Sequence, residues 1–206
     1  FVHKLKNPVS EVKIGLVGKY IELKDSYKSI VESLIHAGVT NRVKVSIQWI
    51  HSEKLSVENV QEYVKDLDGL LVAPGFGQRG FEGKIKAVQF ARESGLPFLG
   101  ICFGMQAAVI EYARNVLNWE DANTSEVDSK SSHKVIDLME EQKNITDMGG
   151  TMRLGACDCK LTDRSIAKQV YKRTNISERH RHRFEFNSAY KEDFEKAGMK
   201  ATGTNP

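Results

Sequence analysis

The feature that most constrains the fold of this chain is an apolar run that leads into a cysteine flanked by two glycines. The run 96–101 leads directly to Cys102, and Gly100 and Gly104 stand two residues before and two residues after it. This order is typical of a strand, a tight turn and the start of a helix, with the thiol at the apex of the turn. Small residues at the two flanking positions allow the sharp backbone turn that exposes the sulfur. We therefore expect a strand end that carries a nucleophile.

The position of Cys102 also predicts how its thiol is activated. The helix that follows directs its positive end toward the sulfur, which favours thiolate over thiol. The backbone N–H of Phe103 then points to where an oxyanion would form. A lone cysteine in an apolar run is more often a small buried side chain, but the glycine spacing favours the functional interpretation.

Strand and helix patterns alternate along residues 12–117. Strands are expected at 12–17, 43–50, 70–73 and before Cys102, and helices at 57–64, 83–93 and 105–117. A further helix is expected to run to Ala37, capped by Asp25 or Ser26. Residues 70–73 are wholly apolar, as in a buried parallel strand. The pattern predicts an α/β fold with a doubly wound, mostly parallel sheet and helices on both faces.

The character of the chain changes after Leu117. Residues 118–132 are polar and rich in turn formers. Strands are expected at 135–139, 149–155 and 184–186, and short helices at 163–171 and 190–197. Residues 1–11 are expected to be a linker, and residues 12–206 to form one domain.

The bulk properties fit a soluble globular protein. The chain has 206 residues, 40% of them apolar and 28% charged, and its net charge of +3 is too small to indicate nucleic-acid binding by itself. An odd number of cysteines argues against a secreted disulfide scaffold and favours a reduced, cytoplasmic setting. Cys157 and Cys159 form a lone C-x-C pair and are expected to be structural. No apolar run reaches the length of a membrane span, and no signal peptide opens the chain.

A second informative segment is a glycine-rich loop after the apolar strand at 70–73. Pro74 and Gly75 follow that strand, and Gly77 and Gly80 come shortly after. Loops at the carboxyl ends of parallel strands carry the sites of open α/β sheets. If this strand neighbours the one before Cys102, the N–H groups of Gly75 and Phe103 lie beside one sulfur.

A third segment, residues 178–185, alternates arginine and histidine. On a strand, Arg179, Arg181 and Arg183 would share one face, and His180 and His182 the other. An arginine suits a carboxylate ligand, and either histidine could be a base for a stand-alone cysteine hydrolase. The run could also belong to a basic binding module in which Cys102 is structural; salt-dependent nucleic-acid binding would support that alternative.

Together these runs resemble the class I glutamine amidotransferases, and in particular the glutaminase domains of bacterial-type CTP synthases. The motifs that carry the resemblance are 100–106, 18–23 with 25–29, 75–80, 149–155 and 178–183. The resemblance covers nearly the whole chain and implies a Cys-His-Glu triad in which Cys102 attacks the side-chain amide of glutamine. It implies an oxyanion hole from the N–H groups of Gly75 and Phe103. It also implies a glutamine-binding set: Gly75, Phe103, Gly104, Met105, Gln106, Glu126 and Arg183.

The resemblance further implies regulation and partners. A loop from Phe76 to Gly83, with Arg79, Gly80 and Glu82, is expected to be a regulatory lid linked to activation by GTP. The domain itself is expected to need no cofactor and no metal. ATP and Mg would bind an N-terminal amidoligase domain, which would join ammonia to UTP and make CTP. The expected assembly is a homotetramer, with no nucleic-acid or membrane partner.

The sequence departs from the family in one respect. The family's histidine and glutamate lie in a His-Pro-Glu motif, which is absent from this sequence. We therefore expect the amidotransferase domain to be incomplete at its C-terminus and residues 1–11 to link it to the amidoligase domain.

Overall fold

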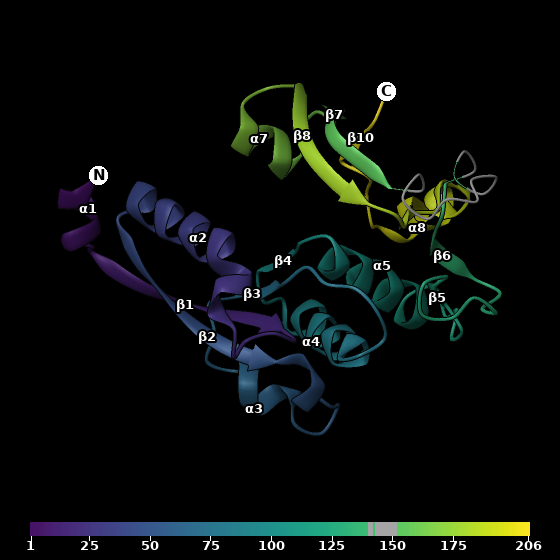
Figure 1. Ribbon diagram of the computed structural model, residues 1–206, viewed down its shortest axis with the longest axis horizontal. Coiled ribbons are helices and arrows are strands. Elements are labelled where there is room, and N and C mark those ends of the chain that lie inside the picture. The colour runs from purple at the N-terminus through teal and green to yellow at the C-terminus, as the bar shows by residue number, and fades with distance from the viewer. Residues whose placement is uncertain (140–141, 143–151) are drawn as a thin grey trace. The chain divides into compact units, whose positions relative to one another are not determined.

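The computed structural model describes residues 1–139, 142 and 152–206, which form two compact units (Figure 1). Unit 1 is Phe1–Tyr112 and unit 2 is Ala113–Pro206. The expected strand at 149–155 lies partly outside the described residues. Among the helices that the structure describes, none combines the length and the apolar character needed to span a bilayer.

Unit 1 is built on a four-stranded sheet in which every neighbouring pair is parallel. Its strands are β1 (Ser10–Gly18), β2 (Val43–His51), β3 (Gly69–Val72) and β4 (Phe98–Gly100), in the order β2-β1-β3-β4. Crossovers between parallel strands need helices, and each strand here is followed by one. The expected α/β fold with a mostly parallel sheet is confirmed.

The helices of unit 1 cover this sheet. They are α1 (Val2–Lys6), α2 (Lys28–Asn41), α3 (Val60–Val64), α4 (Phe81–Ser94) and α5 (Phe103–Asn115), with short 3-10 turns η1 (Lys24–Tyr27) and η2 (Ser52–Lys54). Leu16 lies opposite Leu71 in register and packs with Tyr27 and Trp49 in one cluster. Leu70 points to the other face, and all of β3 is buried. Burial on both faces explains the continuous apolar run of β3.

Residues 1–11 hold α1 and the start of β1, and their role as a linker to another domain stays a prediction. The expected cap of the following helix was wrong. Asp25 and Ser26 do not cap α2; they lie in η1, and α2 begins at Lys28. The buried Tyr27 explains the later start, since its hydroxyl oxygen accepts hydrogen bonds from the backbone N–H groups of Lys19 and Tyr20, at 3.2 and 3.3 Å.

Unit 2 holds two small sheets. One contains β5 (Asn123–Thr124), β6 (Lys134–Asp137) and β9 (Glu185–Phe186) in the order β5-β6-β9; the other contains β7 (Arg153–Leu161), β8 (Asn175–His182) and β10 (Gly203–Thr204) in the order β10-β7-β8. Its helical segments are α7 (Ile166–Tyr171), η4 (Ser188–Tyr190) and α8 (Lys191–Ala197). The short strand and helix predictions at 135–139, 163–171, 184–186 and 190–197 are confirmed within a few residues. The strand expected at 149–155 instead runs on to Leu161 in β7.

An aromatic cluster forms the centre of unit 2. Trp119 stacks on His133 at 4.9 Å and lies 5.2 Å from the ring of Tyr190 and 6.1 Å from that of Phe194. Nδ1 of His133 lies 2.6 Å from a carboxylate oxygen of Asp121. This hydrogen bond is the main cause that lowers the pKa of Asp121 to about 2, and it ties Asp121 to the aromatic cluster.

Candidate active site

Cys102 occupies the turn between β4 and α5 with a φ of 55°. A positive φ is uncommon for a residue with a side chain and is a mark of strained functional positions. The flanking glycines are sterically required. A methyl group at Gly100 would lie 2.6 Å from the carbonyl oxygen of Gly104, and one at Gly104 would lie 2.1 Å from the carbonyl oxygen of Val72. The geometry is that of a nucleophile elbow.

Backbone hydrogen bonds hold this elbow on both sides. The N–H of Ile101 donates to the carbonyl of Val72 at 3.0 Å, which ties the elbow to β3. The N–H of Gln106 donates to the carbonyl of Cys102 at 3.1 Å, which makes Cys102 part of the first turn of α5. The positive end of α5 therefore lies at the thiol and favours its thiolate form.

The expected oxyanion residues lie beside the elbow. A methyl group at Gly75 would lie 3.5 Å from Cδ1 of Phe103, so the loop after β3 contacts the residue after the nucleophile. Phe103 is buried and stacks on Phe81 at 4.3 Å. Met105 is partly exposed and Gln106 is buried, both in the first turn of α5. Unit 1 thus brings together all of its predicted site residues.

Two buried lysines that sequence reasoning did not assign to the site lie against the same loop. Nζ of Lys84 donates to the carbonyl oxygens of Ala73 at 2.7 Å and Pro74 at 3.4 Å. Nζ of Lys19 donates to the carbonyl oxygen of Phe76. Burial lowers the pKa of Lys84 to about 8, and the charge of Lys19 adds to that effect while Cys102 opposes it.

The glycine-rich loop is shorter than expected. We expected it to extend from Phe76 to Gly83, but α4 begins at Phe81, which puts Glu82 in the first turn of that helix. Gly77 and Gly80 have φ values of 72° and 70°, a region that favours glycine. A methyl group at Gly83 would lie 1.8 Å from the carbonyl oxygen of Ser52, so this end of the segment is closely packed.

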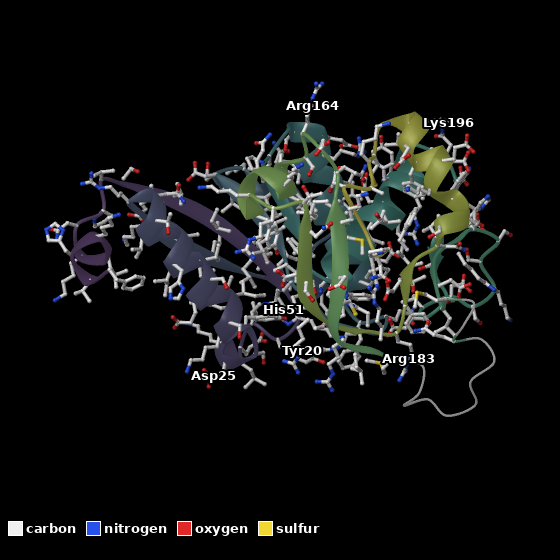
Figure 2. The ribbon with its side chains drawn as sticks, turned by 90° about the horizontal axis from the view of Figure 1, so that it is seen from above. Tyr20, Asp25, His51, Arg164, Arg183 and Lys196 are labelled. Atoms are coloured by element: carbon white, nitrogen blue, oxygen red, sulfur yellow. The ribbon has the colours of Figure 1, made fainter. Side chains whose placement is uncertain are left out.

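Arg79 projects from the loop onto neighbouring elements of unit 1. It forms an ion pair with Glu53, and its guanidinium lies 5.4 Å from the ring of Tyr20. Tyr20 and His51, labelled in Figure 2, belong to the carboxyl ends of β1 and β2, where Gly18 pairs with His51. The loop therefore lies at the carboxyl ends of the strands, where open α/β folds hold their ligands.

In unit 2, Glu126 and Arg183 flank one edge of the β5-β6-β9 sheet. Glu126 lies in the turn after β5, and Arg183 comes two residues before β9. Because β5 is parallel to β6 and β9 is antiparallel to it, the end of β5 and the start of β9 meet at the same edge. Because β6 lies between β5 and β9, these two strands are about 10 Å apart. A small amino acid bound between Glu126 and Arg183 could contact both of these long side chains.

The arginine–histidine run alternates as expected up to His182, where β8 ends. Arg183 follows the strand, so the expectation that it shares a strand face with Arg179 and Arg181 was wrong. Arg179 and Arg181 are exposed, while His180 and His182 are partly buried with their Nδ1 atoms 3.2 Å apart. Burial lowers the pKa of His182, and His180 lowers it further. Across residues 1–139, 142 and 152–206, no group of three or more histidine, cysteine or acidic side chains is arranged to hold a metal ion.

A second arginine of unit 2, Arg153, contacts β9. Arg153 forms a 2.9 Å ion pair with Glu185, and its Nε lies 3.2 Å from the sulfur of Cys157. Glu185 pairs in register with Asp137, whose carboxylate accepts a 2.6 Å hydrogen bond from the hydroxyl of Ser125. These contacts connect the turn that carries Glu126 to the strand that follows Arg183.

Comparison with known proteins agrees with this geometry. The family model described as glutamine amidotransferase class-I matches residues 22–206. The chain belongs to the class-I glutamine amidotransferase family. Within this family the amidotransferase domain is 62% identical to a CTP synthase from Flavobacterium psychrophilum and 51% identical to one from Aquifex aeolicus, over 206 and 205 residues. The two matches cover all of this chain but only 38% of the length of each CTP synthase.

A solved structure agrees with the same assignment. The amidotransferase domain matches the glutaminase domain of Trypanosoma brucei CTPS with bound acivicin at 39% identity and a TM-score of 0.89. The match covers 95% of this chain and 75% of the other. The resemblance to the glutaminase domains of CTP synthases is therefore confirmed.

Proposed function

We propose that this amidotransferase domain hydrolyses L-glutamine to glutamate and ammonia through a thioester on Cys102. The observation that carries the proposal is the strained backbone of Cys102, which the packing around Gly100 and Gly104 imposes. A φ of 55° at Cys102, between two positions that admit no side chain, costs conformational free energy. A cysteine with only a packing role would not require that strain. The names of the relatives point to the same chemistry.

In the proposed reaction the Cys102 thiolate attacks the side-chain carbonyl carbon of glutamine. The N–H groups of Gly75 and Phe103 stabilise the resulting oxyanion. The C–N bond then breaks, the nitrogen takes up a proton and leaves as ammonia, and a thioester remains on the sulfur. Water attacks the thioester carbon, which releases glutamate and restores the thiol. The resemblance assigns the proton transfers to a His-Pro-Glu motif, which this sequence does not contain.

The substrate's α-amino acid end is proposed to bind between Glu126 and Arg183 of unit 2. The resemblance also assigns Gly104, Met105 and Gln106 to glutamine binding. A carboxylate suits the α-ammonium, and the planar guanidinium of Arg183 can hold the α-carboxylate through two parallel hydrogen bonds. The position of both residues at one sheet edge of unit 2 supports this pairing.

We further propose that the ammonia serves the ATP-dependent amination of UTP to CTP in a longer protein, because the CTP synthase relatives are more than twice as long as this chain. ATP and Mg would bind in that other part, GTP would act on the loop 76–80, and the whole would be a cytoplasmic homotetramer. These partners follow from the resemblance alone.

The decisive test replaces Cys102 with alanine in the full-length protein. We expect Cys102→Ala to reduce glutamine-dependent CTP synthesis by at least about 10⁴-fold, since no other group can form the thioester. CTP synthesis from added ammonium should remain, which also shows that the protein is folded. Glutamine-dependent synthesis that persists in this variant would reject the assignment.

A second pair of variants separates the alternative in which β8 supplies the base. His180→Ala and His182→Ala should each keep most of the glutaminase activity under our proposal. Loss of activity in either variant, with a normal KM for glutamine, would instead favour a hydrolase that uses that histidine.

A further inference from the structure

The segment 73–76, which carries Gly75, is held by ammonium groups from two separate elements of unit 1. Lys84 lies on α4 and holds the carbonyls of Ala73 and Pro74, whereas Lys19 follows β1 and holds the carbonyl of Phe76. Both lysines are buried, and Lys84 has no exposed surface. Lysine is rarely buried to this extent unless its ammonium is paired or hydrogen-bonded, because desolvation of an ammonium is costly.

The carbonyl contacts fix the orientation of the peptide that bears the N–H of Gly75. The carbonyl of Pro74 and the N–H of Gly75 belong to one planar trans peptide, so they point in opposite directions. With the carbonyl turned toward Nζ of Lys84, the N–H points away from α4. A methyl group at Gly75 would lie 3.3 Å from Nζ of Lys84 and 3.9 Å from Cε of Lys19, which shows how closely both side chains pack on this residue.

The same ammonium of Lys84 lies close to the residue that follows the nucleophile. Its nitrogen lies 5.1 Å from the centroid of the Phe103 ring, directly after Cys102 in the chain. The charged groups that act on Lys84 are Lys19, which lowers its pKa, and Cys102, which raises it. An attraction between two ionised groups is mutual, so a charge on Lys84 favours the thiolate of Cys102.

We propose that Lys84 and Lys19 are positioning residues: together they hold the Gly75 peptide in the orientation that an oxyanion needs, and Lys84 also stabilises the Cys102 thiolate. The proposal rests on the function proposed above for Cys102 and names two further residues that this function requires. Neither lysine touches the substrate in this scheme. The clamp acts through the backbone of residues 73–76 and through charge.

The test measures Cys102 directly in the full-length protein. The rate of alkylation by iodoacetamide is followed against pH by mass spectrometry of the peptide that contains Cys102. Lys84→Met keeps the length and apolar stem of the side chain and removes the charge. Lys86→Met is the matched control. Lys86 lies on the same helix, but it is partly exposed and its ammonium contacts the side chain of Gln89 rather than the segment 73–76.

Lys84→Met should move the midpoint of Cys102 alkylation upward by about 1 pH unit, as expected on loss of a nearby opposite charge. It should also lower kcat for glutamine hydrolysis by about 10-fold with KM unchanged within about twofold, because the loop acts on the transition state. Lys86→Met should change neither quantity. Thermal unfolding of each variant identifies any that fails to fold.

Lys19→Met provides an independent test should Lys84→Met fail to fold. It should lower kcat in the same way, since the carbonyl of Phe76 loses its donor. If the folded variants keep the parental kcat and alkylation midpoint, or if Lys86→Met shifts them equally, the clamp does not exist. If the parent protein does not hydrolyse glutamine but the alkylation midpoint still shifts in Lys84→Met, the proposed function fails while the electrostatic part of the inference stands.

Discussion

The two units of this chain hold their proposed site residues in different ways. In unit 1 the geometry around Cys102 is fixed by steric exclusion, because Gly100 and Gly104 contact backbone atoms that leave no room for a side chain. In unit 2 Glu126 and Arg183 sit next to strands of only two residues, and polar contacts hold that sheet edge. A site fixed by backbone packing tolerates few substitutions, whereas one built from side-chain contacts can be altered one group at a time.

The contrast matches the chemistry proposed for each unit. Covalent attack requires the sulfur and two N–H groups to be placed within fractions of an ångström. Recognition of an α-ammonium and an α-carboxylate needs the right charges in reach, and long side chains can adjust to them. Under the proposed function, unit 1 would carry the covalent step, and Glu126 and Arg183 of unit 2 would bind the charged groups of the substrate.

Among variants that keep Cys102, the largest effect is expected from a methyl group in the elbow. Gly104→Ala would place that methyl 2.1 Å from the carbonyl oxygen of Val72, so β3 and α5 must separate. We expect glutaminase activity to fall by about 100-fold, as for a misplacement of about 1 Å in an active site. Glutaminase assays of the full-length protein, with circular dichroism as a check on folding, measure this.

Gly155→Ala in unit 2 is the matched control. Its φ of 92° makes alanine unfavourable by about 1–3 kcal/mol. Among the described residues, however, none apart from its two chain neighbours comes within 4 Å of the added methyl. Activity should stay within about threefold of the parent. Equal losses in the two glycine variants would show that the comparison between the units is wrong.

An intermediate effect is expected for the proposed carboxylate clamp. Arg183→Lys keeps the charge but loses the two-pronged hydrogen bonding of the guanidinium, so KM for glutamine should rise by about 10-fold with kcat nearly unchanged. Steady-state glutaminase kinetics give both parameters. Arg181→Lys, on the exposed face of β8, should leave KM as it is. A rise in KM only for Arg181→Lys would move the clamp to that residue.

The smallest effect is expected at the loop 76–80. Arg79 is half-exposed, and its ion pair with Glu53 is of a kind that contributes at most about 1 kcal/mol. Arg79→Ala should therefore reduce the stimulation of glutamine-dependent CTP synthesis by GTP by about two- to fivefold, with little change in synthesis from ammonium. Unchanged stimulation by GTP would show that this loop is not the regulatory lid.

How far the sequence predicted the site depended on whether the geometry is local. The elbow is contiguous, so the spacing of Gly100, Cys102 and Gly104 was sufficient to place it, and the adjacency of β3 and β4 brought Gly75 beside Phe103. The proximity of Glu126 and Arg183 depends on β5 and β9, which are too short to produce a recognisable alternation of apolar and polar residues.

The buried lysines show a different limit. Lys84 lies on the apolar stripe of α4, with Phe81 three residues before it and Val88 four residues after it. That position was a usable signal, but lysine is so often exposed that we did not assign it to the core. The start of α2 was misplaced for a related reason, because Tyr27 bonds through its side chain to the backbone of Lys19 and Tyr20, eight and seven residues earlier, and the sequence pattern gives no sign of that contact.

The placement of the two tryptophans has a consequence for measuring cooperativity. Trp49 lies in the core cluster of unit 1, and Trp119 stacks on His133 in unit 2. Each unit therefore carries one tryptophan, and with selective excitation of tryptophan Trp49→Phe reports on unit 2 and Trp119→Phe on unit 1. Denaturation curves of the two variants would coincide if the units unfold as one and would separate if they melt independently.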